Sequence, residues 1–148
     1  MCTNKTYNHT KKHCELKRKL EMLDKDHKDL MTVLDSFNGK IVLPINKDDL
    51  SKFPLLEWVE LNDKVRIRKR NNYFGVYLNF DTEMKKGGEF GKHFHQDIIE
   101  NAEVIKGKML DRENNQVYGV HDIMHYEKNQ HHTPIALEDT LLKVIFKP

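Results

Sequence analysis

The stretch GGEFGKHFHQDIIENAEVIKG, residues 87 to 107, constrains the fold more than any other part of the chain. His93 and His95 are two positions apart, so in an extended strand both imidazoles point to the same face. Glu100 lies an odd number of positions after His95, and one regular strand would place it on the opposite face. The three side chains converge only if the chain bends near positions 96 and 97. We therefore predict a strand end, a turn and a returning strand.

Two imidazoles and a carboxylate that face one point are suitable ligands for a borderline divalent transition metal. An H-x-H pair alone would be weak evidence, because the chain contains nine histidines. The spacing of the pair from the neighbouring glycines and from Glu100 makes the pattern far more specific than the pair by itself.

Five residues fill, in order, every fixed position of the first cupin motif, G-x5-H-x-H-x4-E-x6-G: Gly87, His93, His95, Glu100 and Gly107. From about Leu55 to Pro148 the chain therefore resembles the cupin superfamily. The resemblance implies an all-β fold, a double-stranded β-helix of jelly-roll type with its site inside the barrel. Alternating residues at 65–70, 73–80 and 140–146, separated by frequent turns, independently indicate an all-β sandwich or barrel.

The second cupin motif supplies one more histidine from a later strand, and this chain carries a degenerate version of it. In its usual form the motif has an Asp, a Pro five residues later, a Gly two beyond that and a His three further. The residues at these spacings are Asp122, Glu127, Asn129 and His132. Asn can replace Gly at a turn, because it accepts a left-handed backbone. The resemblance thus implies a metal site made of His93, His95, Glu100 and His132.

Alternatives remain for the ligands and for the metal. His131 neighbours His132 and points to the opposite face of a strand, so it is the alternative fourth histidine. His121 and His125 are further candidates, for which we expect positions at the surface or beside the ligands. Asp97 is the alternative carboxylate, although it lies in the predicted turn. Glu100 is an ionised ligand or, if it stands back from the metal, a general base. The metal could be iron, manganese, nickel, copper or zinc, and the alternative to a metal site is a polar histidine pair in a barrel that has lost its metal.

Before the barrel, residues 11 to 37 have a helical pattern without Pro or Gly, and Gly39 is expected to end it. An a/d seam of about three heptads runs along this helix: Leu16, Leu20, Leu23, His27, Leu30 and Leu34. The leucines pack either against the same helix of a second subunit or against their own barrel, and we predict a homodimer. We divide the chain into a helical segment with coiled-coil potential (1–37), a connecting segment (38–54) and a cupin barrel (55–148).

The composition argues against several classes of partner. A formal net charge of +2 over 148 residues is too small to indicate nucleic-acid binding. No apolar run is long enough to span a membrane, and the first residues lack the apolar core of a signal peptide. Cys2 and Cys14 are expected to be reduced thiols. We therefore expect a cytoplasmic protein whose partner is a small molecule.

Two hypotheses for the function fit the pattern. The first is a small metal-dependent enzyme acting on a small molecule, with a dioxygenase or an isomerase as options, because three histidines and one carboxylate leave coordination positions open. The second is a non-catalytic metal or ligand sensor with the helix as its dimerisation or output element. Some anti-sigma factors join a zinc-binding helical domain to a cupin, but their Cys-x-x-Cys pair is missing here. Aromatic candidates for the wall of a ligand pocket are Tyr73, Phe74, Tyr77 and Tyr118, and basic candidates for binding an acidic ligand are Arg66 and Arg68.

Overall fold

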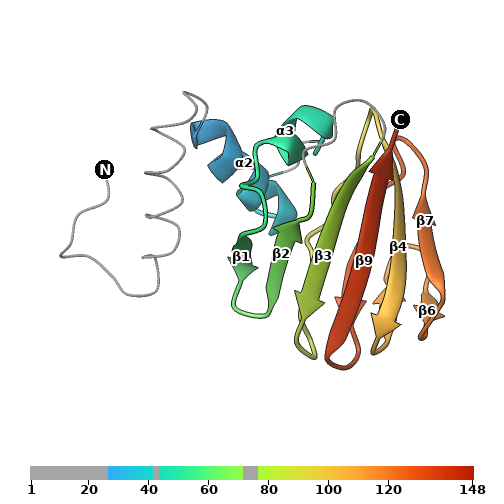
Figure 1. Cartoon of the computed structure of the whole chain (residues 1–148). Helices are drawn as coiled ribbons and strands as arrows, with labels where there is room; N and C mark the ends of the chain where they lie inside the picture. The colour runs from blue at the N-terminus through green and yellow to red at the C-terminus, as the bar shows by residue number, and fades with distance from the viewer. Residues whose placement is uncertain (1–26, 42–43, 72–76) are drawn as a thin grey trace.

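The computed structural model describes residues 27–41, 44–71 and 77–148, with side chains from Leu30 onward. Within these ranges two short helices, α2 (His27–Phe37) and α3 (Lys47–Ser51), precede nine strands (Figure 1). The strands are β1 (Trp58–Asn62), β2 (Val65–Lys69), β3 (Leu78–Met84), β4 (Ile99–Lys106), β5 (Met109–Asp111), β6 (Gln116–Tyr118), β7 (Ile123–Tyr126), β8 (Pro134–Ala136) and β9 (Thr140–Lys147).

The strands form two antiparallel sheets. One has six strands in the order β1-β2-β3-β9-β4-β7, and the other has three in the order β6-β5-β8. The C-terminal strand β9 is hydrogen-bonded between β3 and β4, so it lies in the middle of the larger sheet (Figure 1). Buried residues of both sheets belong to one hydrophobic core. The predicted all-β fold of jelly-roll type is confirmed.

Alternation along the strands of the larger sheet decides which side chains enter this core. In β9 the buried residues are every second one, and the residues between them are partly or fully exposed. The alternation predicted for Leu142, Val144 and Phe146 is therefore confirmed. Strand β3 follows the same rule from Leu78 to Met84, which puts its alternate side chains opposite those of β9 on the inner face.

Helix α2 packs on the barrel of its own chain. It ends at Phe37, and Gly39 follows with a φ of 71°, the left-handed conformation that favours glycine after a helix. Leu30 and Leu34, two positions of the predicted seam, are buried in the same core as the strands, together with Phe37. The first three leucines of that seam and both cysteines lie outside the described residues.

Helix α3 lies within the segment that the sequence indicated only as a polar connection. Its start is fixed by the backbone N–H of Asn46, which donates to Oδ2 of Asp49 at 2.8 Å. Ile45, Leu50 and Phe53 of this segment are buried in the core. A helix of five residues is too short to show a periodic pattern, which is why the sequence did not reveal it. Among the described helices, none combines the length and the apolar character that a membrane crossing requires.

Candidate metal centre

Backbone pairing places two of the histidines opposite each other. His93 and His132 form an isolated antiparallel bridge, in which each backbone N–H donates to the carbonyl of the other at 3.2 and 3.0 Å. After His95 the chain bends at residues 96 and 97, and β4 then begins at Ile99. The predicted bend is therefore present, although the stretch before it is not a regular strand. It brings Glu100 to the inner face of the barrel.

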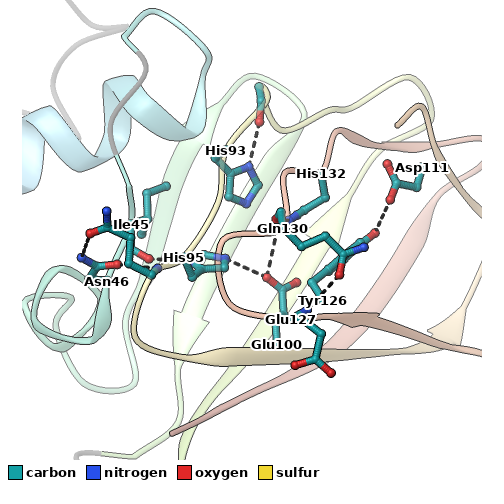
Figure 2. A network of polar contacts seen from close by, with 12 residues as sticks. Ile45, Asn46, His93, His95, Glu100, Asp111, Tyr126, Glu127, Gln130 and His132 are labelled. Atoms are coloured by element: carbon teal, nitrogen blue, oxygen red, sulfur yellow. Dashed lines mark hydrogen bonds and ion pairs between the residues drawn. The ribbon is translucent and has the colours of Figure 1, made fainter. Parts of the chain in front are cut away.

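The structure brings together four side chains that the spacing of the two motifs singled out. Their relative exposures are 3% for His93, 1% for His95, 8% for Glu100 and 0% for His132. One candidate ligand atom from each of them lies within 4.8 Å of all the others. In Figure 2 dashed lines join the Glu100 carboxylate to His95 and to His132, and His93 lies above the carboxylate. This is a compact, buried group of three imidazoles and one carboxylate.

Three backbone carbonyls fix the orientation of the three imidazoles. Nδ1 of His93 donates to the carbonyl of Gly91 at 2.7 Å, and Nδ1 of His132 donates to that of Gln130 at 3.0 Å. Nδ1 of His95 donates to the carbonyl of Ile45, which comes from the segment before the barrel (Figure 2). Because each Nδ1 carries the proton in these bonds, the Nε2 atom of each neutral ring keeps a free lone pair. Carbonyl partners of this kind orient the histidines of metal sites.

The Nε2 lone pairs and the Glu100 carboxylate fit a cation between them. Oε1 of Glu100 lies 3.0 Å from Nε2 of His95 and 3.3 Å from Nε2 of His132. The buried Nε2 of His132 nevertheless has no hydrogen-bond partner of good geometry. A carboxylate oxygen and an unprotonated imidazole nitrogen are both acceptors, so only a proton or a metal ion between them makes such a distance favourable. Nitrogen and oxygen donors of this kind suit a divalent transition metal.

Burial and mutual charge set the protonation of the group. Burial opposes ionisation of Glu100, but the neighbouring His132 and His95 outweigh it and hold the pKa of the carboxyl well below its ordinary value. Burial likewise opposes protonation of His132, yet Glu100 raises the pKa of this imidazole. Burial and the charges of His132 and His95 lower the pKa of His93 far below its ordinary value. The carboxylate is thus ionised and His93 is neutral, as metal ligands must be.

Two further residues, Tyr126 and Asp111, support His132, and no sequence motif indicated this role. The ring of Tyr126 stacks on the imidazole of His132 with centroids 4.0 Å apart and planes only 7° apart. The hydroxyl of Tyr126 donates to Oδ2 of the buried Asp111 at 2.9 Å (Figure 2). Alternation in β7 could have placed Tyr126 inside the barrel, but nothing in the pattern connected it with Asp111 or with a histidine.

The alternative ligands lie away from the group. His131 is exposed, and its ring packs against that of Phe94 with centroids 4.4 Å apart. Asp97 is exposed and accepts a hydrogen bond from the backbone of Lys47. His125 lies on the outer face of β7 between Asn101 and Glu127. Of the alternatives considered, His132 and Glu100 are therefore the ones that meet His93 and His95.

None of the described residues suggested for ligand binding lines the small cavity beside His93 and Glu100, whereas Arg66 borders a separate, larger hollow. Arg66 and Arg68 lie on the outer face of the larger sheet, where they flank Trp58 at 4.3 and 4.5 Å and pair with acidic residues of β3. Tyr77 is exposed, while Tyr118 is buried and bonded to Asn114. The remaining two aromatic candidates, at positions 73 and 74, lie outside the described residues.

Two cavities differ in their relation to the histidines. One of about 30 Å³ is bordered by His93 and Glu100 and is otherwise lined mainly by apolar side chains. A hollow of about 560 Å³ lies at the β1–β2 turn, at the end of β3 and at the start of β9. Mixed charges line this larger hollow, and none of the four clustered side chains reaches it. The chemistry of the group therefore belongs to the small cavity.

Sequence comparison places the chain in no family, because no protein-family model and no curated protein sequence matches it. Comparison of structures is more informative. KdgF from Halomonas sp. is 16% identical with a TM-score of 0.57, covering 62% of this chain and 87% of that chain. An RmlC-like cupin from Shewanella frigidimarina is 15% identical with a TM-score of 0.56, covering 63% and 84%. This chain has the cupin fold.

A third match to this cupin fold comes from a regulatory complex. The structure of Rhodobacter sphaeroides SigE with the anti-sigma ChrR matches at 20% identity with a TM-score of 0.53, covering 63% of this chain and 50% of that chain. At these identities the likeness concerns the fold alone. The function of this chain must therefore be argued from its own buried group.

Proposed function

We propose that this chain is a mononuclear metal-dependent cupin enzyme that acts on a small molecule. In this proposal one divalent transition metal is held by His93, His95, His132 and Glu100. The observation that carries the proposal is the orientation of the three imidazoles, whose Nδ1 atoms are all engaged by backbone carbonyls. Their Nε2 atoms are therefore free for a metal, and the ionised carboxylate supplies a charged fourth ligand.

The donor set leaves room for chemistry at the metal. When bound, such a metal polarises a substrate oxygen, lowers the pKa of bound water or, if it is iron, activates dioxygen. The reaction classes to test are therefore those of an isomerase and a dioxygenase. Four protein ligands leave one or two positions open on a five- or six-coordinate ion. Glu100 serves better as a ligand than as a general base, because its lowered pKa makes it a weak base. The apolar wall around His93 excludes bulk water from the group.

Elemental mass spectrometry on full-length, untagged protein purified without chelators tests the proposed metal. We expect about one iron, manganese, nickel, copper or zinc per chain, lost in the double variant His93→Ala/His95→Ala. The matched control is His125→Ala/His131→Ala, which removes two exposed imidazoles and should keep the metal. Metal-free wild type that takes up no added ion, or a control that loses the metal equally, would contradict the proposal.

A sensor is the second candidate, and one observation favours it. The segment that carries His93 and His95 is tied to the elements before the barrel, since the N–H of Gly91 donates to the carbonyl of Phe37 at 2.6 Å and His95 donates to Ile45. A change in metal occupancy would therefore reach α2 directly. Substitution His93→Ala separates the two candidates. Loss of turnover supports the enzyme, whereas a change only in oligomeric state or partner binding supports the sensor.

A further inference from the structure

The cavity beside His93 and Glu100 is too small for an ordinary substrate. Its volume is about 30 Å³. Pockets that hold drug-sized ligands measure about 300 to 1,000 Å³, at least roughly tenfold more. The cavity that borders His93 and Glu100 thus has room only for a ligand far smaller than a drug-sized molecule.

Side chains from outside the recognised barrel contribute to this limit. Phe37 of α2 and Leu50 of α3 line the cavity beside the barrel residues Phe80, Phe90 and Phe146. The ring of Phe37 packs edge-on against the imidazole of His93, with the two centroids 5.3 Å apart. The centroids of the Phe37 and Phe90 rings are 5.6 Å apart. The two helices before the barrel thus complete the wall of the site.

The backbone of Phe37 is tied directly to the segment that carries His93. Its carbonyl accepts a hydrogen bond from the N–H of Gly91 at 2.6 Å, two residues before His93. Gly39 follows in a left-handed conformation and touches Gly91 closely, since a Cβ on Gly91 would lie 2.2 Å from the Gly39 nitrogen. The backbone that carries the Phe37 ring therefore lies directly against the segment that carries His93.

We propose that Phe37 determines the size of the ligands that reach the metal. In this proposal the centre admits small molecules and excludes those with a ring, because Phe37 lines the cavity and its ring packs against the imidazole of His93. Most of the lining is apolar, so a small molecule of low polarity is the class that fits this wall best. The inference rests on the proposed metal centre, and the experiment separates the two.

Spectroscopy of the cobalt(II)-loaded full chain provides the test, with azide as the small probe and imidazole as the ring-shaped probe. In wild type we expect azide to change the visible absorption and imidazole to leave it unchanged. In Phe37→Ala we expect imidazole to bind at least roughly tenfold more tightly, with azide affinity changed much less. Phe37→Leu serves as the milder variant if Phe37→Ala does not fold. Phe53→Ala is the matched control, because Phe53 lies 6.4 Å from Phe37 between ring centroids but does not line the cavity.

Each other outcome overturns one specific step. Imidazole binding to wild type as tight as that of azide would overturn the size limit, and this arm needs no variant. An equal gain in imidazole affinity in Phe53→Ala would show that any loss of packing in this core admits imidazole, and that Phe37 has no specific role. If no metal binds, the proposed function fails. The size limit that Phe37 imposes is then tested on the metal-free protein. There benzene should raise the Tm of Phe37→Ala but not that of wild type, and equal behaviour of the two proteins would overturn it.

Discussion

At the scale of single residues, the group depends on neighbours that are not themselves ligands. The ring of Tyr126 covers one face of His132, and its hydroxyl reaches the buried carboxylate of Asp111. That carboxylate also accepts the backbone N–H groups of Thr133 and Glu113 through its other oxygen. Asp111 thus connects Thr133, the residue after His132, to the ring that stacks on His132.

Removing the Tyr126 hydroxyl should weaken the fold while leaving the metal in place. Tyr126→Phe keeps the stack on His132 but takes a hydrogen bond from a buried carboxylate, which should cost about 1 to 3 kcal/mol in the free energy of unfolding. Urea denaturation measures that loss, and elemental analysis checks the metal. Tyr118→Phe is the control, since its hydroxyl only accepts from Asn114 at 3.1 Å, and it should cost about 1 kcal/mol or less. An equal cost for both variants would contradict the role of Asp111.

The four clustered side chains were predictable because two motifs encode their spacing, and the structure brings those side chains together. That they hold a metal stays a proposal. The carbonyl of Ile45 could not have been found from the sequence, because every residue has a carbonyl and Ile45 is 50 positions from His95. Tyr126 and Asp111 carry no motif either. Spacing thus predicts which side chains converge, whereas the groups that orient them depend on packing between distant segments.

On the outer face, Asp81 should make stability depend on acid pH. Burial raises its pKa, but hydrogen bonds and charges from Arg68 and Arg70 outweigh this and lower it. A carboxyl with a lowered folded-state pKa stabilises the fold above its unfolded pKa of about 4, and this contribution is lost as pH falls through the folded value. The unfolding free energy of wild type should therefore exceed that of Asp81→Asn at neutral pH, and the gap should shrink below about pH 4. Urea titrations across that range measure the gap, and a constant gap would contradict the mechanism.

At the scale of elements, the segment that follows α2 lies against the segment that carries two of the histidines. Ile45 donates its N–H to the carbonyl of Phe94 at 2.9 Å and accepts from the His95 ring. The side chains of Asn46 and Gln96 are bonded to each other, and Oδ1 of Asn46 also accepts the backbone N–H of Gln96. The two segments thus act as one unit around the site.

Close contact of Gly39 and Gly91 makes this unit sensitive to one methyl group. A Cβ on Gly91 would lie 2.2 and 2.3 Å from the Gly39 nitrogen and Cα, which are backbone atoms that cannot rotate away. Gly91→Ala should therefore separate the segments, destabilise the fold by about 3 kcal/mol or more and weaken metal binding.

Thermal unfolding and metal stoichiometry measure these two effects. The control is Gly119→Ala, whose added Cβ meets no atom closer than 3.8 Å and should change stability by about 0.5 kcal/mol. Normal stability and metal content in Gly91→Ala would show that the segments can move apart freely.

The elements differed in how far the sequence could predict them. β2 lies within the stretch 65–70 that alternation indicated, because one side of the strand faces the core and the other side is partly exposed. Asn129 has a φ of 65°, as expected of the residue that replaces glycine in the second motif. Helix α3 was missed because its sequence, KDDLS, contains a single apolar residue. Its position depends on the burial of that Leu50, which only the assembled barrel provides.

At the scale of the whole molecule, the barrel and the segment before it share one core. Leu30 and Leu34 face the barrel of their own chain, so they are not available for a seam between subunits. A homodimer through the helix therefore stays a prediction that depends on leucines outside the described residues. The motifs alone indicated a barrel that begins near residue 55, because they contain no information about what covers its open side.

Removing the segment before residue 55 should unfold the barrel. Seven apolar side chains from this segment are at most 5% exposed: Leu30, Val33, Leu34, Phe37, Ile45, Leu50 and Phe53. Their burial contributes about 1.5 to 3 kcal/mol each, together about 10 to 20 kcal/mol, which matches or exceeds the whole stability of about 5 to 15 kcal/mol that a typical domain has. We therefore expect residues 55–148 alone to lack a cooperative thermal transition by circular dichroism and to bind no metal. Residues 27–148 should keep both the thermal transition and metal binding, since they include every residue of the described core. A 55–148 fragment that folds and binds metal would show that the segment before residue 55 is an accessory to the barrel and not a part of it.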